Sequence, residues 1–173
     1  MTVHRARRDF AACTADALDY VLARHAIDGG IRSELLTAYE RLDAYAEVPT
    51  MLATLRRHGF RLAILSNGTS KMLIACQAAG ITALLHDVIS VEQADSFKPA
   101  PAVYSLVQTE LGVTPARTLF VSGNPWDSQA ALAHGFAVVR VNRHGDPDGL
   151  RPHLVAELRD LTGLPAVLVP PTA

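Results

Sequence analysis

The stretch Leu119-Phe120-Val121-Ser122-Gly123-Asn124-Pro125-Trp126-Asp127 decides the fold, because an apolar run changes abruptly into small polar residues. The stretch Arg61-Leu62-Ala63-Ile64-Leu65-Ser66-Asn67-Gly68 repeats this design. Lys98 stands between the two stretches, in Phe97-Lys98-Pro99. Apolar strands that open into polar loops are typical of a site at the carboxyl edge of a parallel sheet. The sequence therefore predicts such a site, built from two strand ends and a lysine.

Strand-like and helical patterns alternate on both sides of these stretches. The predicted strands are continuous apolar runs, as expected for parallel strands covered on both faces, at residues 62–65, 88–91, 119–121 and 138–141. Helical periodicity separates them, and each helical segment ends at a glycine, at residues 72–80, 104–112 and 128–135. We therefore predict an α/β fold with a doubly wound parallel sheet.

Residues 1–48 show only helical patterns. The predicted helices are Thr14 to His25, with Thr14 as its N-cap, and residues 31–45. A third helix is predicted to begin at Pro49. The chain of 173 residues thus divides into a helical unit, 1–48, and an α/β core, 49–173. The apolar runs 154–158 and 166–169 are expected to pack back on that core.

Composition excludes several classes of partner. The formal net charge is −1 and charged residues make up 19% of the chain, which gives no support to a nucleic-acid partner. No run approaches the roughly 20 apolar residues of a membrane span, so no membrane partner is expected. Cys13 and Cys76 form no metal or redox motif, which favours a reducing, cytoplasmic location.

Polar residues after the first strand have two interpretations. The hydroxyl of Ser66, the carboxamide of Asn67 and the backbone N–H groups of the turn could bind an anion. Alternatively, the same residues only begin the next helix. Lys98 could neutralise a carboxylate, although a single lysine is more often solvated. Tyr104 fits either the site or ordinary core packing.

The loop 122–127 carries more polar groups than a turn and a helix cap need. Ser122 and Asn124 follow the strand, and Asp127 could hold a water, a lysine or a metal. The alternative is a simple turn with a buried Trp126.

At these residues the chain resembles the haloacid dehalogenase superfamily, and within it the (S)-2-haloacid dehalogenases. Leu65-Ser66-Asn67-Gly68 is similar to the second motif of the family. Val88-Ile89-Ser90-Val91, with Phe97-Lys98-Pro99 and Tyr104, is similar to the third, and 119–127 to the fourth. The resemblance implies a haloacid dehalogenase-like core, 49–173, with a partial helical cap, 1–48.

The resemblance also implies a mechanism without metal or other cofactor. An aspartate attacks the halogen-bearing carbon of a short 2-haloacid, and water then hydrolyses the aspartyl ester. In this sequence Ser66 and Asn67 would bind the substrate carboxylate, and Lys98 with Ser122 would serve the nucleophile. Tyr104 would position the substrate or the lysine. Asn124 and Asp127 would position the hydrolytic water, and Trp126 would line the halide side of the pocket.

Two alternatives remain at this point. Metal-dependent phosphatases of the same superfamily carry two acidic residues in the fourth motif, but here Ser122 stands in place of the first and only Asp127 remains. The second alternative is a non-catalytic remnant or binding module that uses the helices as an interface. A homodimer is expected, because members of the family commonly pair through such helices.

The nucleophile motif of the family, a central strand ending in aspartate, should precede the cap helices. This sequence begins inside the cap, so we expect the first central strand to be missing and the truncated chain to be inactive alone. Two sheet edges would then be unpaired. We expect such a chain to be unstable, to rearrange, or to recruit a strand from elsewhere.

Overall fold

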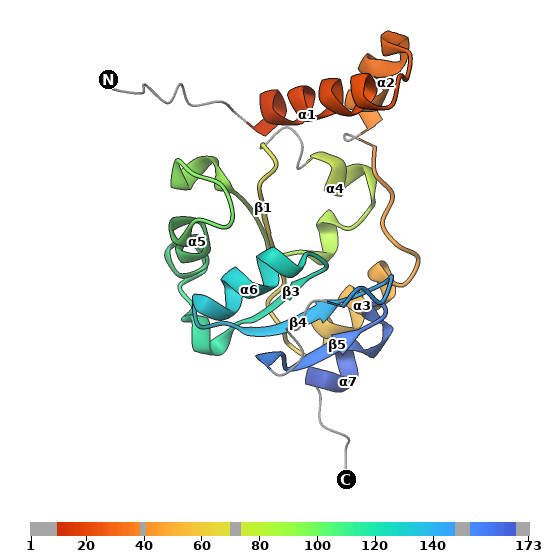
Figure 1. Cartoon of the computed structure of the whole chain (residues 1–173). Coiled ribbons are helices and arrows are strands. Elements are labelled where there is room, and N and C mark those ends of the chain that lie inside the picture. The colour runs from red at the N-terminus through yellow and green to blue at the C-terminus, as the bar shows by residue number, and fades with distance from the viewer. Residues whose placement is uncertain (1–9, 39–40, 70–73, 148–152, 169–173) are drawn as a thin grey trace, which may run out of the picture.

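Parallel strands in two separate sheets form the centre of the molecule (Figure 1). In the first sheet, β1 (Ala63–Ser66) pairs with β2 (Asp87–Ser90). In the second, β3 (Leu119–Ser122) pairs with β4 (Ala137–Val141), and β4 pairs with β5 (Ala156–Leu158). The structure is a computed structural model and describes residues 10–38, 41–69, 74–147 and 153–168. The predicted α/β class with parallel strands is confirmed.

Every predicted strand forms within a residue or two of its expected position, and β5 is an addition. The apolar run at 154–158 packs on the core as expected, and within it Ala156-Glu157-Leu158 forms a parallel strand that was not predicted. A strand of three residues with a glutamate at its centre lacks the continuous apolar run that marked the other strands. It forms because β4 offers an edge for pairing, and Leu158 packs in the core beside Val139.

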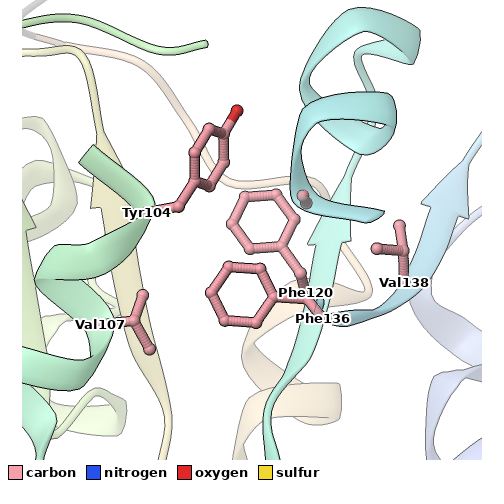
Figure 2. Packing of buried hydrophobic residues seen from close by; sticks show 6 residues of the cluster. Tyr104, Val107, Phe120, Phe136 and Val138 are labelled. Atoms are coloured by element: carbon pink, nitrogen blue, oxygen red, sulfur yellow. The ribbon is translucent and has the colours of Figure 1, made fainter. Parts of the chain in front are cut away.

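Helices cover both faces of the β3–β4–β5 sheet, as a doubly wound architecture requires. One cluster of buried side chains joins α5 (Pro101–Leu111) and α6 (Pro125–Ala133) to β3 and β4. Figure 2 shows the rings of Tyr104, Phe120 and Phe136 gathered in this cluster. The other cluster joins α3 (Val48–Arg57) and α7 (Leu164–Leu168) to β4. Val138 and Val139 are both fully buried, one in each cluster, because successive residues of a strand point to opposite faces.

The remaining regular segments are short. A one-turn helix, α4 (Ala75–Ala78), stands where residues 72–80 were predicted, and Met72 and Leu73 lie outside the described residues. Single 3₁₀ turns occupy Gly29–Ile31, Thr82–Leu84, Val91–Ala94, Pro115–Arg117 and Leu161–Gly163. Among the described residues, no helix has the length and apolar character needed to cross a bilayer.

The N-terminal helices differ from their predicted bounds. Helix α1 (Phe10–Arg24) already includes Thr14, whose hydroxyl donates to the carbonyl of Phe10, so Thr14 is not an N-cap. Helix α2 (Arg32–Ala38) is much shorter than the predicted 31–45, since residues 42–45 are not helical. Helical spacing of apolar residues was misleading here because Leu42 and Tyr45 are exposed rather than packed on a helix face.

A gap separates the two sheets. No described strand pairs with β1 on the side away from β2, or with β3 on the side away from β4. Every residue of β1 keeps some solvent exposure, and Val121 of β3 is 38% exposed. Parallel strands are normally covered on both faces and paired on both edges. The described strands therefore leave two unpaired edges, one on β1 and one on β3.

Candidate functional site

Lys98 and Asp127 form a buried ion pair at the carboxyl end of β3. The ammonium Nζ lies 3.2 Å from Oδ2 of Asp127, and the two side chains are 9% and 6% exposed. The hydroxyl of Ser122, the last residue of β3, donates to the same oxygen at 2.9 Å. Asp127 lies in the first turn of α6, directly after the loop that leaves β3. The strand end and the helix start thus bring the predicted Ser122 and Asp127 together with Lys98.

Tyr104 completes the set of donors around this carboxylate. Its phenol oxygen, on α5, donates to Oδ1 of Asp127 at 2.7 Å, and the residue is 1% exposed. Burial, with a further contribution from the hydrogen bond to Asp127, raises the pKa of the Tyr104 phenol, which therefore stays protonated. Asp127 accepts three hydrogen bonds in a dry place, so its geometry suits holding other groups and leaves little room for it to attack a substrate.

The ammonium of Lys98 has an apolar neighbour as well as its charged one. It lies 5.0 Å from the centroid of the Phe120 ring. Burial lowers the pKa of Lys98, and the charge of Asp127 opposes that shift. A buried lysine with one charged partner suits a cation that serves a nearby anion.

Asn67 connects the first loop to the same lysine. Its Oδ1 accepts the backbone N–H of Lys98 at 2.8 Å, and the Oγ of Ser66 accepts the N–H of Gly68 at 3.0 Å. Each of these oxygens accepts a hydrogen bond, and no bond from the serine proton or the asparagine NH₂ to another described residue is seen, so both groups can donate to a ligand. Two donors at a strand end can bind an anion such as a carboxylate.

Asn124 and Trp126 lie at the edge of this cluster. Both are exposed, Trp126 by 46%, so the alternative of a buried tryptophan is wrong. The backbone N–H of Asn124 donates to the hydroxyl of Ser122. A cavity of about 440 Å³ opens beside them over the ends of β3 and β4, lined in part by Ser122, Gly123, Asn124 and Arg140.

Three features of the site were not predicted. Ser90, 6% exposed at the end of β2, donates to the carbonyl of Gly68 at 2.9 Å and so holds the first loop. The ring of Phe10 on α1 packs 6.0 Å from that of Phe97, next to Lys98. Arg140 is 2% exposed and pairs in register with Ser122. For Arg140, a signal was available in the sequence, because an arginine stands inside an otherwise apolar strand.

The site has the chemistry to bind and neutralise anions. Its groups are the buried Lys98 cation, a serine and an asparagine whose hydroxyl and NH₂ can donate, and a carboxylate that accepts three hydrogen bonds. Within the described part of the chain, no group of three His, Cys, Asp or Glu side chains gathers as a metal site would require. A reaction at this site would also need a group that attacks the substrate.

Comparison with known proteins agrees with these features. A family profile described as haloacid dehalogenase-like hydrolase matches residues 5–135. The chain is 39% identical over 142 residues to (S)-2-haloacid dehalogenase 1 of Pseudomonas sp. (strain CBS-3), covering 80% of this chain and 63% of the relative. It is 35% identical over 164 residues to (S)-2-haloacid dehalogenase 2 of the same strain, covering 90% and 71%. The chain thus spans about three fifths of the length of the first of these relatives.

Solved structures show the same fold. The L-2-haloacid dehalogenase from Xanthobacter autotrophicus superposes with a TM-score of 0.82 at 32% identity, over 96% of this chain and 78% of that one. A second structure of that enzyme holds chloropropionic acid covalently bound. From the matched profile, the identity to these relatives and the shared fold, we conclude that the chain belongs to the haloacid dehalogenase-like hydrolase family.

Proposed function

We propose that this chain carries most of the active site of a (S)-2-haloacid dehalogenase, which cleaves the carbon–halogen bond of short 2-haloalkanoic acids. The observation that supports this most directly is the buried Lys98 ammonium, held by Asp127 between two polar strand ends. A cation in that place stabilises a carboxylate that attacks from the gap between β1 and β3. The covalently bound chloropropionic acid in the Xanthobacter autotrophicus enzyme is consistent with such a covalent step.

The proposed reaction has two steps. An aspartate oxygen forms a bond to C2 of the substrate, and the halide leaves with the electrons of the broken carbon–halogen bond. Water then adds to the carbonyl carbon of the resulting ester, which releases the 2-hydroxy acid and restores the carboxylate. We propose that a further extended segment, which the described residues do not include, lies between β1 and β3 and supplies this aspartate. The two unpaired edges and the exposed Val121 support that placement.

Each predicted residue has a proposed part in this reaction. The donors of Ser66 and Asn67 bind the substrate carboxylate, and Lys98 with Ser122 stabilises the attacking aspartate. Tyr104 positions Lys98 through Asp127, which the hydrogen bonds to Asp127 support. Together with Asp127, the exposed Asn124 positions the hydrolytic water, and Trp126 lines the halide side of the pocket.

Phosphatase activity is the weaker alternative. A hard divalent cation needs several oxygen ligands, and here the oxygens of Asp127 already accept hydrogen bonds from Lys98, Ser122 and Tyr104. The alternative of a non-catalytic binding module is favoured by one observation, the gap between β1 and β3. It predicts anion binding at Ser66 and Asn67 without turnover.

The experiment that separates these functions measures chloride release and binding together. Chloride release from (S)-2-chloropropionate, with the (R) enantiomer as control, is measured for this chain and for Lys98→Met. Binding of unreactive propionate is followed by NMR shifts of the Ser66 and Asn67 amides, and hydrolysis of p-nitrophenyl phosphate is measured with Mg²⁺. Because the proposed aspartate lies outside the described residues, release is measured both without and with an added peptide of the aspartate-bearing strand of a relative. Release that requires this peptide and disappears in Lys98→Met supports the dehalogenase, and propionate binding without release even when the peptide is present supports the binding module. Phosphate ester hydrolysis, or neither binding nor release, contradicts the proposal.

Assembly, location and domain division are further proposals. Apolar side chains of the α1–α2 unit are exposed and would be covered in a homodimer, among them Tyr20, Val21, Ile27, Ile31 and Leu35. A shift from dimer to monomer in Tyr20→Glu, measured by sedimentation, would support that interface. The free thiols of Cys13 and Cys76 are consistent with the cytoplasm. The divisions 1–48 and 49–173 are tested by proteolysis, with cleavage expected near residues 41–44.

A further inference from the structure

The segment 41–47 connects the α1–α2 unit to helix α3 and crosses the edge of the cavity. It contains no helix or strand, and its Tyr45 is 61% exposed. A ring with that much exposure is not held in place by burial. Something else must fix the segment where it passes the ends of β3 and β4.

Arg143 makes the contacts that do so. Its guanidinium carbon lies 3.6 Å from the centroid of the Tyr45 ring, and Nη2 lies 2.5 Å from Oε1 of Glu47. The face of the guanidinium is used by the ring and an edge by the carboxylate, so one side chain holds two residues of the segment. The ion pair is only partly exposed, at 22% for Arg143 and 17% for Glu47.

We call the contacts of Arg143 with Tyr45 and Glu47 the clamp. The loop that carries Arg143 is itself held to the core. Asn142, the residue before Arg143, is 3% exposed, and its N–H donates to the carbonyl of Leu158. Its side-chain oxygen accepts the N–H groups of Gly145 and Asp146, and its amide donates to the carbonyl of Asp146. The loop that carries Arg143 is therefore fixed to the core, and the segment 41–47 is fixed to that loop.

The clamp also borders the site. Tyr45 and Arg143 line the same cavity of about 440 Å³ as Ser122, Gly123 and Asn124. We propose that Arg143 is a positioning residue that, by holding Tyr45 and Glu47, keeps the segment 41–47 in place as a wall of this cavity. The clamp thereby controls how freely the cavity beside Ser122 and Asn124 opens to solvent. This inference concerns the wall alone and does not depend on the proposed reaction.

The amide of Val48 gives a direct measure of the wall, because its N–H donates to the carbonyl of Tyr45 at 2.9 Å. In Arg143→Lys the positive charge remains, but the planar group that stacks and pairs at once is lost. We expect hydrogen exchange at the Val48 amide to accelerate roughly tenfold in Arg143→Lys, and more in Arg143→Leu. The amides of Val138 and Val139 should keep their exchange rates, since the core is unchanged.

Two controls show whether the effect is specific. Tyr45→Phe retains the ring and should keep exchange at Val48 at the wild-type rate, whereas Tyr45→Leu should match Arg143→Lys. Arg117→Lys changes an exposed arginine on the 3₁₀ turn before β3 and should have no effect. Val141→Cys, in a chain that also carries Cys13→Ser and Cys76→Ser, places a thiol in the cavity lining. This thiol should react faster with a charged thiol reagent when Arg143→Leu is added. Unchanged exchange at Val48 in both Arg143 variants, or acceleration of the core amides as well, would overturn the proposal.

Discussion

The phenol of Tyr104 donates to Oδ1 of Asp127 at 2.7 Å, across the 23 residues that separate them in the chain. This contact joins the aromatic core under β3 to the polar site above it, because the Tyr104 ring packs against Phe120 and Phe136. Tyr104 is thus both a core residue and a site residue, the two interpretations that the sequence allowed. Packing holds the ring, and the ring places the donor.

Tyr104→Phe should keep the packing and remove the donor. Because Asp127 is 4% exposed, the lost bond is not replaced by bulk water, and we expect a destabilisation of about 1–3 kcal/mol. Urea unfolding followed by circular dichroism measures it. Tyr20→Phe, on a residue that is 68% exposed, is the matched control and should change the unfolding midpoint very little. Equal effects of the two substitutions would contradict a specific role for the bond.

Removing one partner of the buried ion pair should be costly. In Asp127→Asn the Lys98 ammonium keeps its charge without its neighbour, and we expect a loss of about 3–5 kcal/mol in unfolding free energy. The double variant Lys98→Met with Asp127→Asn should lose less than the sum of the single variants, since no unpaired charge remains. Strict additivity in urea unfolding would show that the pair is not coupled.

Binding of carboxylates should fail at a lower pH than an ordinary lysine would allow. Burial lowers the pKa of Lys98 in the folded chain from the ordinary 10.5, so the ammonium loses its proton earlier as the pH rises. As the pH is raised, propionate affinity, measured by NMR, should therefore begin to fall before the pH reaches 10.5. In Lys98→Arg the affinity should fall only at a higher pH. The unfolded chain binds the extra proton between the two pKa values, so stability should rise with pH in that window. Affinity that persists unchanged beyond pH 10.5 would count against Lys98 as the cation.

The first polar loop should depend on Ser90. Ser90→Ala removes the donor to the carbonyl of Gly68 and should cost about 1 kcal/mol in unfolding free energy. Exchange of the Gly68 amide, which donates to Ser66, should accelerate because the loop is less constrained. Ser105→Ala removes only an exposed hydroxyl bond within α5 and serves as the control. No acceleration at Gly68 would mean that Ser66 and Asn67 are held by other contacts.

Prediction from the sequence succeeded where a pattern is local and repeated. The runs 62–65 and 119–121 are apolar and short, and polar residues follow at once, so the strand and the loop after it could be assigned. It failed for β5 and for residues 42–45. Whether Ala156-Glu157-Leu158 is a strand depends on the edge that β4 offers, and whether 42–45 is helical depends on packing that does not occur.

The candidate site divides in the same way. That Ser66, Asn67, Lys98, Ser122 and Asp127 belong together followed from parallel strands ending at one edge, which the motifs alone implied. Which atoms meet was decided only in three dimensions. The bond from Lys98 to Asn67 and the place of Ser90 depend on how β1, β2 and the following loops pack, and their spacing in the chain does not encode that.

The amino-acid order by itself therefore determined the class of fold, the order of β1 to β4 with the helices between them, and the residue types at the sheet edge, because periodicity and polarity are local properties. Tertiary structure decided that β5 pairs with β4, that the Asp127 carboxylate accepts hydrogen bonds from Lys98, Ser122 and Tyr104, and that Arg143 holds the segment 41–47. These depend on contacts between residues far apart in the chain, whose geometry is set only when the core packs.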